Sequence, residues 1–297
     1  MKIGIFAKTF RRPTIEELFQ AIASYGINSA QFNLSCAGVE TLPANVSSEL
    51  VQRITGSAEH ASVELAAISG TFNMAHPDPA IRSDNSMKFE ILCEVTARLR
   101  IPVITLCTGT RDPVDMWKWH SENNSKEAWG DMVRSIESCL IAAEKHSLIV
   151  AIEPESENVV NSASRARKLL DEMRNPRLRI VIDPANLVHP GCNQKEVLNE
   201  SFGLLGDAIA IAHAKDRSHD FQPCAAGKGI LDFGYYLRCL KNIGFAGPLI
   251  LHGLEENEVE FSREFIYRSL NDNVELVDVP ASRRSYRHVD DPEGKGL

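Results

Sequence analysis

The chain has 297 residues, of which 43% are hydrophobic and 24% charged, so it can bury a large core without disulfides. Lys and Arg total 32 against 40 Asp and Glu, and the net charge of −8 argues against a nucleic-acid partner, because an acidic surface repels phosphate. Seven scattered cysteines, no apolar run of ~20 residues and an N-terminus too quickly polar for a signal peptide predict a reduced, cytoplasmic protein with no membrane partner.

Short apolar runs recur along the chain, and each is followed by a longer segment with helical spacing. Two of these runs, LIVAIE and RIVIDP, contain continuous apolar stretches, which is typical of parallel strands buried on both faces. We expect strands at Ile3–Phe6, Ser29–Leu34, Leu65–Ser69, Val103–Cys107, Ile149–Glu153, Leu178–Ile182, Ile209–His213 and Pro248–His252. We expect helices at Thr14–Tyr25, Ser47–His60, Ala80–Leu99, Ala128–Lys145, Ser162–Met173, Lys195–Leu205, Phe233–Ile243 and Ser262–Leu270.

Eight strand–helix units in a chain of this length predict an α/β fold, a single parallel eight-stranded (β/α)8 TIM barrel over residues 1–272. An open doubly wound sheet ranks second, because no glycine-rich GxGxxG turn follows the first strand. Residues 273–297 carry arginines, prolines and terminal glycines without a helical period. We expect a polar tail there, either disordered or docked on another subunit, and a solvated end without function is the simpler interpretation.

The last four predicted strands end in ionisable residues: Glu153 followed by Glu155, then Asp183, His213 and His252. Catalytic groups of a TIM barrel lie at the C-terminal ends of its strands. A structural ion pair explains one such carboxylate, but four consecutive strands with this pattern favour a functional site. Carboxylate and imidazole ligands together suit one divalent ion, Mn, Mg, Co or Zn.

A second group of polar residues follows the third and fourth strands. Arg111 offers five donors in a fixed fork, which suits a carboxylate, a phosphate or vicinal hydroxyls. His76 either hydrogen-bonds a substrate hydroxyl or is satisfied within its own loop. Trp117 and Trp119 form either an aromatic wall for a sugar or a plug beneath a long loop.

Several short segments of the sequence occur in an order that resembles the sugar phosphate isomerase/epimerase family of xylose-isomerase-like TIM barrels. The resemblance covers roughly residues 1–270. It rests on VAIEPE at 150–155, VIDPANL at 181–187, IAHAKD at 211–216, GKGILDF at 227–233 and GPLILHG at 247–253, with NMAHPDPAIR at 73–82 and TLCTGTRDP at 105–113.

The resemblance implies a single divalent metal bound by Glu153, Asp183 and His213. The family's fourth ligand is a glutamate at the end of strand eight, where this chain has His252; Glu255 is the nearby alternative. In ketose 3-epimerases of the family, the two ligand glutamates face opposite sides of the reacting carbon, and one removes the proton that the other replaces. The substitution by His252 therefore departs from the two-carboxylate pattern.

The implied activity is isomerisation or epimerisation of a small sugar, keto-sugar or sugar phosphate through an enediolate, within carbohydrate metabolism. Glu153 or Glu155 is the expected base, and His252 the fourth ligand or second acid/base group. Lys215 and Arg217, with Arg111, are expected to neutralise the oxyanion or hold an anionic group. The expected substrate-binding residues are His76, Arg111, Asn186, Lys215, Arg217 and Glu255.

Two other functions compete with this one. An AP-endonuclease-type phosphodiesterase on the same barrel needs a three-metal cluster with more histidines, and Cys107 and Asn186 stand where two of them are expected. A barrel that binds a sugar or a partner without turnover is favoured by the changed residue at the end of strand eight. Metal content and proton exchange distinguish these functions. From the resemblance we also expect that the protein can form a homo-oligomer.

Overall fold

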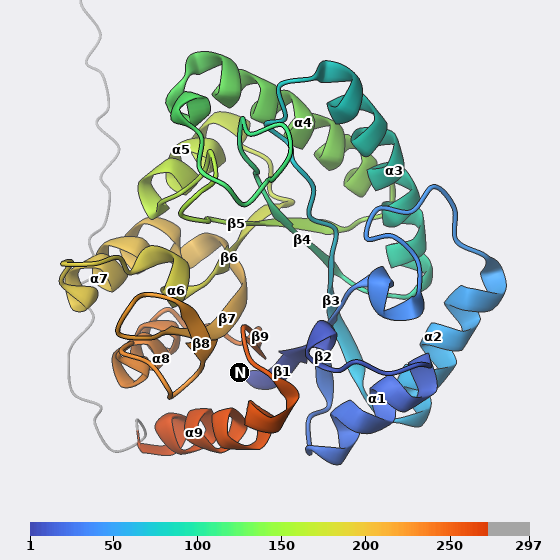
Figure 1. The fold of residues 1–297 in the computed structure, drawn as a ribbon, viewed down its shortest axis with the longest axis vertical. Helices are drawn as coiled ribbons and strands as arrows, with labels where there is room; N and C mark the ends of the chain where they lie inside the picture. Colours follow the sequence, from blue (N-terminus) through green and yellow to red (C-terminus); the bar gives the residue numbers. More distant parts are fainter. Residues whose placement is uncertain (273–297) are drawn as a thin grey trace, which may run out of the picture.

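The computed structural model describes residues 1–272, and the predicted tail at 273–297 lies outside the described residues. Eight parallel strands close into a barrel with the helices around it (Figure 1). Each strand pairs with the next, and the last lies between β7 and β1, which confirms the predicted TIM barrel. The barrel strands are β1 (Lys2–Phe6), β2 (Ser29–Phe32), β3 (Glu64–Ser69), β4 (Val103–Cys107), β5 (Ile149–Glu153), β6 (Leu178–Ile182), β7 (Ile209–Arg217) and β9 (Pro248–Leu251).

The helices begin where the sequence supplies capping side chains. Thr14 accepts a hydrogen bond from the Glu17 N–H at the start of α1, and Ser162 accepts one from the Arg165 N–H at the start of α5. The α-helices are α1 (Ile15–Ser24), α2 (Ser48–His60), α3 (Pro79–Arg98), α4 (Lys126–Lys145), α5 (Ala163–Met173), α6 (Pro184–Leu187), α7 (Gln194–Leu205), α8 (Phe233–Asn242) and α9 (Val259–Asp272). Short 3-10 turns lie at Ala7–Thr9, Leu34–Ala37, Ser121–Asn124, Gly206–Ala208 and Glu256–Glu258. Within residues 1–272, none of the helices has the length and apolar character that crossing a bilayer requires.

The seventh strand is longer than the sequence predicts. It continues past His213 to Arg217 and pairs antiparallel with an additional short strand, β8 (Pro223–Ala225). Asp216 fixes this hairpin, because its buried carboxylate accepts hydrogen bonds from the backbone N–H groups of Gly227, Gly229 and Leu231. The glycine-rich segment after β8 is thus a backbone turn wrapped around one carboxylate.

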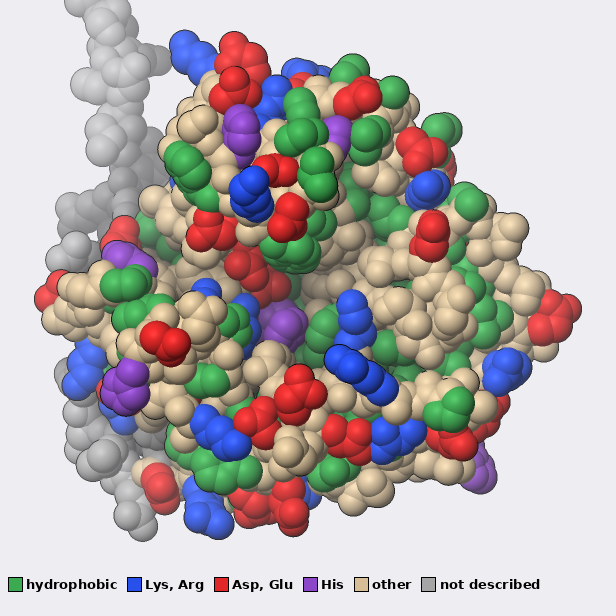
Figure 2. All heavy atoms as spheres, viewed as in Figure 1, with side chains coloured by type: hydrophobic (Ala, Val, Ile, Leu, Met, Phe, Trp, Pro, Cys, Tyr) green, Lys and Arg blue, Asp and Glu red, His purple; other side chains and the backbone are tan. Residues whose placement is uncertain are grey.

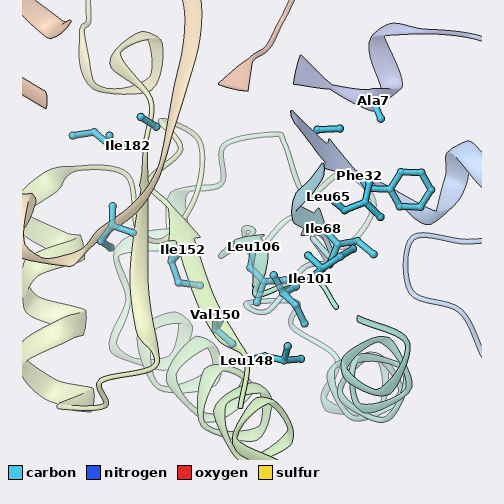
Figure 3. Close-up of a cluster of buried hydrophobic side chains, with 14 of the residues drawn as sticks. Ala7, Phe32, Leu65, Ile68, Ile101, Leu106, Leu148, Val150, Ile152 and Ile182 are labelled. Atoms are coloured by element: carbon cyan, nitrogen blue, oxygen red, sulfur yellow. The ribbon is translucent and has the colours of Figure 1, made fainter. Parts of the chain in front are cut away.

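Side chains alternate between the inside of the barrel and the helices. On β5, Val150 and Ile152 belong to the core between strands and helices, part of which is drawn in Figure 3, whereas Ala151 belongs to a separate cluster inside the barrel. That inner cluster is Ala67, Val103, Ala151, Val181, Ile211 and Ile250. Moving two residues along the same strands gives a second inward layer of polar side chains: Ser69, Thr105, Glu153, Asp183, His213 and His252. This polar layer therefore packs on a layer of apolar side chains inside the barrel.

Candidate metal centre at the mouth of the barrel

Glu153, Asp183 and His213 converge at the C-terminal end of the barrel. One ligand atom from each lies within 4.8 Å of the others, and all three residues are buried. His213 Nδ1 is 3.2 Å from Glu153 Oε1 and 3.6 Å from Asp183 Oδ2. Figure 2 shows charged and histidine side chains gathered around a hollow at the centre of this face. Two carboxylates and one imidazole in this arrangement offer the oxygen and nitrogen donors that suit a divalent transition metal.

Asp183 has one carboxylate oxygen bonded to the backbone and one that faces the cluster. It caps the short helix α6, where its Oδ1 accepts a hydrogen bond from the Ala185 N–H at 2.9 Å. Pro184 follows at the first helical position, which fixes the turn out of β6. Oδ2 is buried and lies 3.1 Å from Lys215 Nζ and 3.6 Å from His213 Nδ1. A buried carboxylate oxygen is costly without a positive partner, so this atom is suited to a cation.

Gln31 on β2 sets the orientation of the His213 ring. The Gln31 amide nitrogen donates to Thr105 Oγ1 at 3.2 Å, so its carbonyl oxygen faces His213 Nε2 at 3.0 Å. An oxygen at this position requires the proton on Nε2, and this places the Nδ1 lone pair toward Glu153 and Asp183 when the imidazole is neutral. Gln31 therefore acts as the partner that metal-binding histidines usually have at their second nitrogen.

Three carboxylates, those of Glu153, Glu155 and Asp183, surround Lys215 and His213 at the site. Lys215 Nζ is 3.1 Å from Asp183 Oδ2 and 3.7 Å from Glu155 Oε1. Burial opposes the Lys215 charge, but the surrounding carboxylates outweigh it and raise the pKa of Lys215, so the ammonium stays charged. Burial lowers the pKa of His213, but the neighbouring carboxylates raise it to about 9, so the metal-free centre holds a proton on this ring. A divalent ion would replace that proton and pair with the carboxylates in its stead.

Glu155 differs from Glu153 in its environment. Burial raises its pKa, Lys215 lowers it, and the charges of Glu153 and Asp183 raise it further, with a resulting pKa of about 7. Its side chain keeps 18% of its surface exposed, so it remains accessible from the mouth. A carboxyl group with a pKa near neutrality beside a ligand cluster is suited to take and return a proton.

His252 lies beside the cluster and outside the three-residue group. Its ring is 5.0 Å from the His213 ring and stacks on Phe6 at 4.9 Å with an interplanar angle of 8°. Burial, together with the positive charges of His213 and Lys215, lowers the pKa of His252 well below its usual range, so the imidazole is neutral. Its Nδ1 is buried without a hydrogen-bond partner among residues 1–272. An unpaired ring nitrogen, a donor or an acceptor according to the tautomer, is therefore buried next to the predicted ligands.

The other predicted substrate-binding residues divide into two groups. Asn186 belongs to the centre: its side-chain nitrogen donates to Glu153 Oε1 at 2.8 Å, and its oxygen accepts from Lys215 at 2.7 Å. Arg217 lies farther along β7, where it donates to the carbonyl oxygens of Ala185 and Phe221. Glu255 is exposed at the start of a 3-10 turn.

His76 and Arg111 lie together in a network of hydrogen bonds and an ion pair that connects the loops after β3 and β4. Arg111 forms an ion pair of 2.6 Å with Asp131 on α4 and donates to the Ala75 carbonyl oxygen. Both ring nitrogens of His76 are also occupied, by the Pro113 carbonyl and the Asp78 N–H. Arg111 and His76 thus each bond to the loop of the other residue, while the buried Nε of Arg111 has no hydrogen-bond partner among residues 1–272.

Two residues of the centre were not predicted from the sequence. Gln31 orients His213, and the buried Tyr236 on α8 donates from its hydroxyl to the carbonyl oxygens of Ile182 and His213, which links the end of β6 to the middle of β7. Side chains alternate between the two faces of β2, and this alternation is a signal that could have identified Gln31 as pointing into the barrel. Tyr236 lies within an ordinary amphipathic helix, where its role depends on contacts distant in sequence.

Comparison with solved structures shows the same fold. A D-psicose 3-epimerase from Clostridium cellulolyticum H10, solved with D-tagatose, superposes with a TM-score of 0.72 at 15% identity over 91% of this chain and 99% of that one. An L-ribulose 3-epimerase gives 0.74 at 14% identity over 94% and 100% of the two chains. A 3-keto-D-glucoside 4-epimerase from E. coli gives 0.72 at 15% identity over 90% and 99%. Comparison with curated protein sequences gave no significant match.

A family model agrees with the structural comparison. The model described as xylose isomerase-like TIM barrel matches residues 19–269, which include every barrel strand except β1. The match therefore contains the buried Glu153, Asp183 and His213 as well as most of the barrel that positions them. The chain belongs to the xylose isomerase-like TIM-barrel family.

Proposed function

We propose that this protein is a divalent-metal-dependent isomerase or epimerase of a small keto-sugar. The observation that supports this most strongly is the buried cluster of Glu153, Asp183 and His213, whose ligand atoms lie within 4.8 Å of one another beside Lys215. These three residues would hold Mn, Mg, Co or Zn. The bound ion would supply Lewis-acid polarisation of the substrate carbonyl and its neighbouring hydroxyl.

The chain's own residues carry the proton transfer. Glu155 is the proposed base that removes the proton next to the carbonyl, because its pKa of about 7 lets it exchange a proton near neutral pH. Lys215 stays charged beside Asp183 and Asn186, and it would stabilise the negative charge that develops on the enediolate oxygens. Asn186 contacts both Glu153 and Lys215, so it would fix the positions of the Glu153 carboxylate and the Lys215 ammonium group relative to each other.

His252 is assigned the second proton-transfer role in the place of the family's glutamate. Its neutral imidazole has a buried free Nδ1, and its ring stacks on Phe6, which limits its orientation. Because its depressed pKa keeps the imidazole neutral, its part in this role would be to donate an N–H proton to the enediolate and then recover a proton. The alternative role, as fourth metal ligand, predicts a loss of metal affinity in His252→Ala. The proton-transfer role predicts unchanged metal content with lost turnover.

The test combines metal content with proton exchange. The wild-type protein and the variants Glu153→Gln and Asp183→Asn are purified without a metal-affinity tag, loaded with Mn²⁺ and analysed by mass spectrometry. Deuterium uptake from D2O into D-tagatose, D-fructose and a 3-keto-glucoside follows by NMR. Glu137→Gln, on the exposed face of α4, is the matched control.

The proposal predicts about one metal per chain and deuterium uptake into at least one ketose for the wild type and the control, and neither for the two site variants. Metal bound without deuterium uptake in any of the ketoses would reject the enediolate chemistry. Equal metal content in all folded variants would reject the site itself.

A further inference from the structure

A cavity of about 580 Å³ lies beside the metal centre, in the size range of sites for small molecules. Its walls come from the N-terminal end of α5, from α6, from α7 and from the loop after β7. In Figure 1 these elements lie next to one another on the side of the barrel formed by β5, β6 and β7.

The cavity and the metal centre share Asn186 as a wall. Asn186 lines the cavity, and its amide hydrogen-bonds Glu153 and Lys215 inside the centre. Arg217, another lining residue, follows the predicted ligand His213 by four positions on β7. A substrate whose reacting carbon lies at Glu153 would reach this space past the side chain of Asn186.

The lining favours an uncharged polyhydroxyl group. Ser162, Ser164 and Asn161 offer hydroxyl and amide groups, and Phe221 supplies an aromatic side chain, a combination that suits the polar edges and apolar faces of a sugar ring. The lining also contains the carboxylates of Glu157 and Glu200, which repel a phosphate.

The one arginine of the lining does not reverse this preference. The Arg217 guanidinium already donates to the carbonyl oxygens of Ala185 at 2.7 Å and Phe221 at 2.9 Å, so much of its bonding capacity is used within the fold. With one cation against the carboxylates of Glu157 and Glu200, the cavity gives an anionic group no net attraction.

We infer that this cavity is a second sugar subsite, and that the substrate is a neutral keto-sugar extended by a glycosidically linked sugar unit. The reacting unit lies at the metal centre and the second unit lies between α5, α6 and α7. This inference rests on the proposed function for the identity of the reacting unit, but binding of the second unit does not depend on turnover. A phosphorylated monosaccharide is the alternative that the lining disfavours.

Ser164→Trp provides the test, because Ser164 is exposed on α5 and its replacement by an indole fills the cavity with little cost to the fold. Ser164→Ala keeps the cavity open, and Ser138→Trp places the same indole on the exposed face of α4, outside the cavity. Calorimetry measures binding of unreactive sugars: glucose, then maltose, cellobiose, lactose, sucrose and trehalose, and glucose 6-phosphate. Turnover is measured separately with methyl 3-keto-glucoside and a 3-keto-disaccharide.

The wild type is expected to bind at least one disaccharide at least tenfold more tightly than glucose and glucose 6-phosphate. Ser164→Trp should remove that advantage, and the two controls should keep it. The inference is overturned if every disaccharide binds no better than glucose, if glucose 6-phosphate binds best, or if Ser164→Trp binds the disaccharide like wild type. If the disaccharide binds as expected and neither keto-sugar exchanges deuterium, the subsite stands and the proposed chemistry fails.

Discussion

Replacement of Gln31 by leucine removes the partner of His213 without removing any proposed ligand. Leucine has nearly the shape of glutamine, so the change creates little cavity, but it leaves the buried Nε2–H of His213 and the hydroxyl of Thr105 without their partner. A buried polar group left unpaired costs about 1–3 kcal/mol of stability. The tautomer that directs Nδ1 toward Glu153 also loses its support.

Loss of an outer partner of a histidine ligand lowers metal affinity by about 10–100-fold, which is about 1.4–2.7 kcal/mol of binding free energy. We expect Gln31→Leu to weaken Mn²⁺ binding by this factor and to lower the free energy of unfolding by about 1–3 kcal/mol. Competition with a fluorescent chelator gives the affinity, and urea unfolding followed by circular dichroism gives the stability.

Two variants control for side effects of this substitution. Gln31→Glu keeps an oxygen facing His213 Nε2 and should bind metal at least as tightly as wild type. Gln20→Leu, on the exposed face of α1, should change neither quantity. Wild-type affinity in a folded Gln31→Leu protein would refute the account of how His213 is oriented.

Three further predictions follow from the contacts of the centre. Glu155→Gln should reduce deuterium exchange by about 10²–10⁴-fold at unchanged metal content, and a large loss of metal would instead make Glu155 a ligand. Asp216→Ala removes the acceptor of several backbone N–H groups in the β7–β8 hairpin and should cost about 3 kcal/mol or more in urea unfolding; a cost below about 1 kcal/mol would contradict its structural role. In the metal-free protein, burial lowers the pKa of His213, but the carboxylates of Glu153 and Asp183 raise it to about 9 from an ordinary 6.5. The folded state therefore holds this proton more tightly than the unfolded state does. The thermal midpoint of the metal-free protein should fall as pH rises from 6.5 through 9, whereas the metal-loaded protein should lack this decrease.

The barrel was predictable because buried parallel strands appear in the sequence as continuous runs of apolar residues. The bounds of β4, β5 and β6 agree with the expected ones, since β-branched runs between polar loops leave little ambiguity. The expected end of β7 at His213 was wrong, because the polar residues that follow are held in strand conformation by pairing with β8 and by hydrogen bonds to Asp216. Neither contact has a local signal in the sequence.

The convergence of Glu153, Asp183 and His213 follows from the same pattern, since each lies two residues beyond an inward-facing apolar residue of its strand. The surroundings of Arg111 were less predictable. Its partner Asp131 lies twenty residues away on α4, and no pattern in the loop sequence distinguishes an arginine that braces the fold from one that faces a ligand. The catalytic and substrate-binding roles given to individual residues stay predictions.

The most direct measurement is an anomalous difference map from a crystal of this protein soaked with Mn²⁺. The account predicts one strong peak at the C-terminal end of the barrel, at about 2.0–2.2 Å from oxygens of Glu153 and Asp183 and from Nδ1 of His213. A well-ordered map with no peak among these three residues, or with the ion bound elsewhere, would contradict the central claim that their convergence is a metal site.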